Sequence, residues 1–132
     1  MLILTKYIAK HELAPLSRFV GLEDILDGAK KALKGLATEL KAPSNARGFR
    51  FFKVRVGKRN GARMIVFLVT QSQKVVPVLI RLKKDKVFGM NMAMNNEKVI
   101  DQLTKNVYRI LDDIEAEEYE EFPFKKNYPL LE

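Results

Sequence analysis

Three apolar runs separated by two short polar turns constrain the fold of this chain more than any other feature. They cover Phe49–Val56, Ala62–Gln71 and Val75–Lys84. Apolar and basic residues alternate along the first run, which is the period of a strand with one buried face. The Asn60-Gly61 dipeptide is a strong hairpin signal, and connections this short allow only antiparallel pairing. The runs therefore predict an antiparallel sheet, with the second run in its middle because it is apolar on both faces.

The remaining elements are predicted from hydrophobic periodicity and from capping and breaking signals. Pro77 cannot donate a ladder hydrogen bond, so we expect the third run at an edge of the sheet or bulged there. Asn95 or Asn96 is expected to cap a last helix, and the acidic run Glu115–Glu121 is expected to fray after it. The other predicted elements are a strand over Leu2–Ile8, a short helix over Lys10–Phe19, an amphipathic helix over Leu22–Leu40 and a last helix whose apolar stripe runs from Val99 to Ile114.

The predicted fold class is α+β, with a single antiparallel sheet of about four strands. The N-terminal helices are expected on one face of this sheet, and a C-terminal helix completes the fold. At 132 residues the chain is long enough for one domain with an ordinary core, which we place at residues 1–122 with a tail over 123–132. Because no apolar run reaches membrane-spanning length and the first residues lack a secretion signal, we expect a cytoplasmic protein without a membrane partner.

Positive charge is concentrated in the central third of the chain. Residues 41–86 contain thirteen Lys or Arg residues and one acid, Asp85, whereas residues 97–132 contain five basic and ten acidic residues. A sheet that carries this much like charge indicates an anionic partner, and a polyanion is the simplest one. The acidic C-terminal segment is a second candidate partner, which would cover the basic face from within the same chain.

Most catalytic chemistry is excluded by composition. The chain has no cysteine, and His11 is its only histidine, so thiol chemistry and a His-rich metal site are excluded. The turn GKRNG lacks the strand–loop–helix setting of a phosphate-binding loop. We therefore expect no metal and no cofactor, and the basic strands remain as the candidate site.

Five basic residues of the three runs are expected on one face of the sheet. Lys53 and Arg55 are two residues apart on a strand, so their side chains leave the same face about 7 Å apart. Phe51 lies on that side too, which places a ring for base stacking beside two cations. Arg63 follows the turn on the neighbouring strand, and Arg81 and Lys83 share a face of the third strand.

The order of these elements, with the sequence FKVRVGKRNGARMIVFLV and a further strand ending in RLKKD, resembles the RelE/ParE superfamily of bacterial toxins, in particular its RelE and HigB-like branch. The resemblance covers roughly Leu2 to Lys86. It implies the toxin of a type II toxin–antitoxin system. Such a toxin is a metal-independent endoribonuclease, an mRNA interferase that cuts messenger RNA on the ribosome and is silenced by a cognate antitoxin protein.

The resemblance also implies roles for individual residues. Lys53 and Arg55 match the two basic positions of the first central strand, and Arg63 matches the arginine after the turn. The basic group at the end of the last core strand is Arg81, Lys83 or Lys84. A lysine would act as base on the 2′-hydroxyl while arginines stabilise the charge on the phosphate. We thus expect Lys53, Arg55, Arg63 and Lys83 to be catalytic and Phe51, Lys58, Arg59, Arg81 and Lys84 to bind RNA.

Two departures from the family pattern keep other functions open. Residues 87–91 carry no titratable side chain where some members have a tyrosine or histidine, and the acidic extension after Ile114 is not part of the minimal fold. One alternative is a ParE-like toxin that acts on gyrase without cutting RNA. Another is a basic RNA- or DNA-binding module without catalysis, whose binding would depend steeply on salt.

Overall fold

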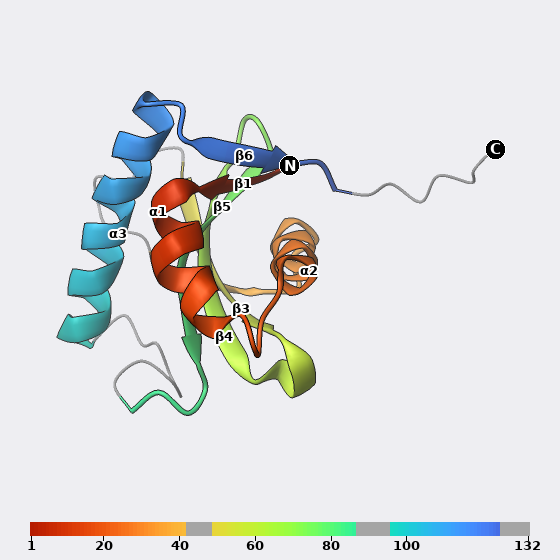
Figure 1. The fold of residues 1–132 in the computed structure, drawn as a ribbon. Coiled ribbons are helices and arrows are strands. Elements are labelled where there is room, and N and C mark those ends of the chain that lie inside the picture. Colours follow the sequence, from red (N-terminus) through yellow and green to blue (C-terminus); the bar gives the residue numbers. More distant parts are fainter. Residues whose placement is uncertain (42–48, 87–95, 125–132) are drawn as a thin grey trace.

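A computed structural model describes residues 1–41, 49–86 and 96–124. The described residues form an α+β fold in which helices cover both faces of one six-stranded sheet (Figure 1). The strands are β1 (Leu2–Thr5), β2 (Thr38–Leu40), β3 (Phe49–Val56), β4 (Ala62–Val69), β5 (Lys74–Leu82) and β6 (Tyr119–Phe122). The helices are α1 (Lys6–Ile8), the π-helix η1 (Ala9–Leu13), the 3-10 helices η2 (Ala14–Leu16) and η3 (Lys58–Asn60), α2 (Leu22–Leu33) and α3 (Glu97–Glu115).

The central meander is confirmed. Strands β3, β4 and β5 pair antiparallel in sequence order, and β4 lies inside the sheet. Ile65 is opposite Leu79 and Val66 is opposite Pro77, so Val78 is an extra residue in β5. The predicted bulge at Pro77 is therefore present, and the alternative of an edge position is wrong because β5 lies between β4 and β1.

The sheet is mixed and larger than predicted. Its strand order is β2-β3-β4-β5-β1-β6, and β1 runs parallel to β5 through the Leu2–Val75 pair. The two edge strands come from segments that we expected to be helical or frayed. The helix predicted to run to Leu40 ends at Leu33, and Gly35 with a φ of 76° turns the chain back into β2. The acidic run supplies β6, which pairs antiparallel with β1.

Helix α2 packs alone on one face of the sheet. A Cβ atom on Gly28 would lie 2.6 Å from Cγ1 of Val56 and 2.8 Å from Cε of Met64. The missing side chain thus lets the helix backbone approach β3 and β4 closely. Ile25, Ala29 and the alternate residues of these strands complete this half of the core.

Helices α1 and α3 and the π-helix η1 lie on the opposite face (Figure 1), so the prediction of helices on one face is wrong. Asn96 is the N-cap of α3, and its Oδ1 accepts a hydrogen bond from the Lys98 backbone N–H at 3.0 Å. Val99, Leu103 and Ile110 are the buried apolar residues of α3. None of the described helices combines the length and the apolar character needed to cross a bilayer.

The predicted division into a domain over 1–122 and a tail over 123–132 stays a prediction. Strand β6 ends at Phe122, and Phe124 packs against the core on the α2 side of the sheet. Residues 125–132 lie outside the described part of the chain, as do residues 87–91, where the sequence departs from the toxin pattern.

Candidate nucleic-acid interface

Three arginines form a row across the sheet. Arg55 on β3 is directly opposite Arg63 on β4, and Arg63 is directly opposite Arg81 on β5. Because side chains alternate along a strand, all three leave the face that carries α1 and α3. Like charges directly opposite one another destabilise a sheet. We call these three residues the arginine row.

Arg63 is largely occupied by the hairpin that precedes it. Only 8% of the residue is exposed. Its Nη1 donates to the carbonyl oxygens of Asn60 at 2.9 Å and of Ala62 at 3.2 Å. Burial, and then the neighbouring charge of Arg55, lower the pKa of the Arg63 guanidinium from its ordinary value. Arg63 thus fixes the turn and adds positive potential, while Arg55 is the exposed member of the row.

Arg81 is held by a buried carboxylate. Glu12 of the π-helix η1 is 3% exposed, and its Oε1 accepts hydrogen bonds from Nη1 of Arg81 and from the Ile80 backbone N–H, the latter at 2.7 Å. Strand β1 ends at Thr5, and the Glu12 side chain takes the place of a neighbouring strand at Ile80. Glu12 accepts these hydrogen bonds inside the core. It therefore holds Arg81 in place and is too buried to contact a substrate.

Asn106 of α3 completes this buried network. Its Nδ2 donates to the Val78 carbonyl oxygen at 2.7 Å and to Oε2 of Glu12 at 3.2 Å, and its Oδ1 accepts from Nε2 of Gln102 at 2.9 Å. The bulge residue Val78 supplies the carbonyl that the asparagine uses. The network therefore joins η1, β5 and α3 behind Arg81. The sequence reasoning missed Glu12 and Asn106, although a polar residue at 106 interrupts the apolar stripe of α3 and signals a buried partner.

The other basic residues gather at the same end of the sheet. Lys53 is half-buried and lies two residues before Arg55, on the same face of β3. Lys58 and Arg59 are exposed at the β3–β4 turn. The Lys83 backbone N–H donates to the Gly61 carbonyl oxygen at 2.8 Å, which ties the end of β5 to this turn. The structure thus brings together eight of the nine predicted site residues: Lys53, Arg55, Lys58, Arg59, Arg63, Arg81, Lys83 and Lys84.

Phe51 does not have the position that base stacking requires. Its ring is 5% exposed and packs against Phe67, with ring centroids 6.1 Å apart. The alternation of β3 places it on the expected face, but the covering elements bury that face at this point. His11 is exposed, and its ring lies 4.4 Å from that of Tyr7.

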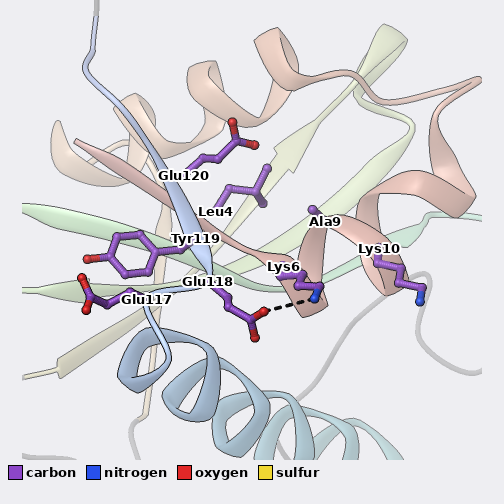
Figure 2. Close-up of a pocket in the computed structure, with 8 residues that line it drawn as sticks. All are labelled: Leu4, Lys6, Ala9, Lys10, Glu117, Glu118, Tyr119 and Glu120. Atoms are coloured by element: carbon purple, nitrogen blue, oxygen red, sulfur yellow. Dashed lines mark hydrogen bonds and ion pairs between the residues drawn. The ribbon is translucent and has the colours of Figure 1, made fainter.

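The acidic segment does not cover the basic residues. Strand β6 forms the edge of the sheet beyond β1, whereas β3 lies next to the other edge. An open cavity of about 610 Å³ lies between α1 and β6. Lys6 and Glu118, which line it, form an ion pair at 3.1 Å (Figure 2). The described residues hold no group of three or more His, Cys, Asp or Glu side chains placed to bind a metal ion. The cavity lies beside β6, across the sheet from β3, and is separate from the arginine row.

Comparisons of the chain with protein-family models, with curated proteins and with solved structures found no match.

Proposed function

We propose that this chain is the toxin of a type II toxin–antitoxin system and cleaves messenger RNA at the arginine row. The proposal includes a cytoplasmic location, a cognate antitoxin as protein partner and messenger RNA, on the ribosome, as substrate. It rests on the RelE and HigB-like sequence pattern of the central strands. The observation that supports it is the direct alignment of Arg55, Arg63 and Arg81 on three neighbouring strands.

The surroundings of the row suit an RNA backbone. Arg55, Lys58, Arg59, Lys83 and Lys84 are exposed at one end of the sheet, and Glu12, the carboxylate that accepts a hydrogen bond from Arg81, faces the interior. Phosphate contacts from several such side chains supply most of the affinity in sequence-independent RNA binding.

The proposed reaction needs no metal ion. Lys53 or Lys83 takes the proton of a 2′-hydroxyl, and the 2′-oxygen forms a bond to the adjacent phosphorus. The bond from phosphorus to the 5′-oxygen of the next nucleotide breaks, and that oxygen takes up a proton. The products are a 2′,3′-cyclic phosphate and a 5′-hydroxyl. Arg55 stabilises the added negative charge on the phosphate in the transition state.

A non-catalytic RNA-binding module is the second candidate. It is favoured by the environment of Glu12, because the carboxylate beside the row is buried and fully hydrogen bonded. Phosphate binding by Arg55 and the exposed lysines would then be the whole function.

The test is induction of the wild-type chain and of Lys53→Ala/Arg55→Ala in bacteria, with growth curves and primer extension on a reporter messenger RNA. Arg63 is left intact because it holds the hairpin. Lys31→Ala/Lys34→Ala on α2 is the matched control, since it removes the same charge from the opposite face of the sheet. Thermal unfolding of each purified variant verifies its fold.

The outcomes separate the candidate functions. Growth arrest with new 5′ ends that disappear only in the Lys53/Arg55 variant supports the nuclease. Growth arrest without cleavage overturns it in favour of a ParE-like target. RNA binding by the purified chain without arrest or cleavage overturns it in favour of the binding module.

A further inference from the structure

A second cavity lies on the same sheet face as the arginine row, at the opposite end of the strands. It has a volume of about 320 Å³ and is enclosed by β1, β3, β4, β5, β6 and the last turns of α3. We call it the α3 cavity. Six residues separate Phe49 at its mouth from Arg55, which corresponds to about 20 Å along a strand. The cavity is thus separate from the proposed RNA site.

Apolar side chains at the α3 cavity remain exposed. Among the described residues, eight large apolar side chains are exposed, and three of them, Phe49, Leu111 and Ile114, line this cavity. Phe49 packs edge-on against Phe67, with ring centroids 5.1 Å apart. Exposed apolar groups concentrated around a hollow mark a binding site more often than a chance feature of the surface.

One cation stands at the rim of this apolar cavity. Lys74 is the only charged residue among the described residues that line it, and Ser72 and Tyr119 add hydroxyl groups. None of the three ion pairs found in the described ranges includes Lys74. An apolar hollow with one cation and two hydroxyl groups at its edge is complementary to an apolar group that ends in an anion.

We propose that the α3 cavity binds a small amphipathic carboxylate, with its hydrocarbon or aryl part between Phe67 and Leu111 and its carboxylate at Lys74. A nucleotide fits less well, because largely apolar walls leave the polar edges of a base without partners. A second copy of the chain fits less well too. Three exposed side chains are far from the roughly 800 Å² that each partner buries in a stable dimer.

The test is an NMR titration of the full chain with octanoate and, as the uncharged match, 1-octanol. We expect octanoate to shift the amide signals of Phe49, Lys74 and Leu111 and to bind about tenfold more tightly than 1-octanol, the value of one charge-assisted hydrogen bond. Lys74→Gln should lower the affinity for octanoate to that of 1-octanol and leave 1-octanol binding unchanged. The control Lys34→Gln on α2 should change neither affinity, and Leu111→Trp, which fills the mouth, should weaken both.

Equal affinities of the wild-type chain for the two probes, or shifts that map outside the cavity, overturn the proposal. So does self-association of the wild-type chain in sedimentation that Leu111→Trp abolishes, because the cavity would then be an interface between two copies. If Leu111→Trp does not fold, the comparison of Lys74→Gln with the wild-type chain still decides the test. None of these outcomes depends on RNA cleavage.

Discussion

Arg63 and Arg81 lie directly opposite each other on β4 and β5, yet their guanidinium groups donate hydrogen bonds to different kinds of acceptor. Arg63 donates to two backbone carbonyl oxygens of its own hairpin, and Arg81 donates to the buried carboxylate of Glu12. Each arginine is thereby fixed by the fold itself. Arg55, the third member of the row, is exposed, and the row therefore divides into two anchored cations and one that faces solvent.

This difference between exposed Arg55 and anchored Arg63 predicts that alanine substitution mainly affects RNA binding at Arg55 and stability at Arg63. Arg55→Ala should weaken binding of single-stranded RNA and reduce the slope of log K against log salt by about one, while stability stays the same or rises slightly because a like charge opposite Arg63 is removed. Arg63→Ala should lower the free energy of unfolding by about 2 kcal/mol, because two carbonyl groups lose a charged donor. Filter binding at several salt concentrations and urea unfolding measure the two effects. Equal losses of stability in both variants would contradict the division of the row.

Glu12 should be the most sensitive polar residue for stability. Glu12→Ala removes the carboxylate that accepts from Arg81, from the Ile80 N–H and from one Asn106 donor, and breaking a buried pair in this way costs about 3 kcal/mol or more. Glu12→Gln keeps the shape and an acceptor, so its loss should be smaller. Lys10→Ala, an exposed residue of the same π-helix, serves as the control and should change stability by less than about 0.5 kcal/mol. Urea unfolding followed by circular dichroism ranks the three variants.

Arg59 should combine local strain with a role in binding. Its φ of 56° is in the left-handed region, which costs a residue with a side chain about 1 kcal/mol relative to glycine. Arg59→Gly should therefore raise the free energy of unfolding by about that amount, while RNA affinity falls through the lost charge. Lys58→Gly removes a charge from the same turn at a residue without positive φ, and it should lower affinity with no gain in stability. A gain in both variants would show that the backbone angle is not the cause.

The ion pair between Glu39 and Arg50 should make stability depend on pH. The hydrogen bond from Arg50 holds the pKa of the Glu39 carboxyl below its ordinary value. A depressed folded-state pKa stabilises the fold above the unfolded-state pKa, and this contribution disappears as pH falls through the folded-state pKa. Wild type should thus be more stable than Glu39→Gln near neutral pH and lose that advantage in acid. Unfolding midpoints between pH 7 and pH 2 test this, and a constant difference would contradict it.

Gly28 should not tolerate a side chain. Alanine at this position gains about 1 kcal/mol of helix propensity, but its methyl group would overlap Val56 and Met64. Overpacking of a core costs about 1–3 kcal/mol, so Gly28→Ala should lower the melting temperature. An unchanged melting temperature would show that Met64, which is flexible, moves aside.

Local patterns in the sequence determined the centre of this protein. The alternation of β3 fixed its two faces, the Asn60-Gly61 turn fixed the antiparallel pairing, and Pro77 marked the bulge of β5. These features depend on neighbouring residues, so the sequence places Arg55, Arg63 and Arg81 on one face of the sheet. The same reasoning placed the cap of α3 at Asn95 or Asn96, and the structure shows that Asn96 is the cap.

Only the tertiary structure decided which strands and side chains surround β3, β4 and β5. The parallel pairing of β1 with β5 and the edge strands β2 and β6 depend on contacts between distant segments, for which local periodicity carries no signal. Glu12 is 69 residues from Arg81 and 94 from Asn106, so the network behind the arginine row was invisible in the sequence. Phe51 shows the same limit: alternation gave its face correctly, but burial depends on which elements cover that face, and these come from other parts of the chain.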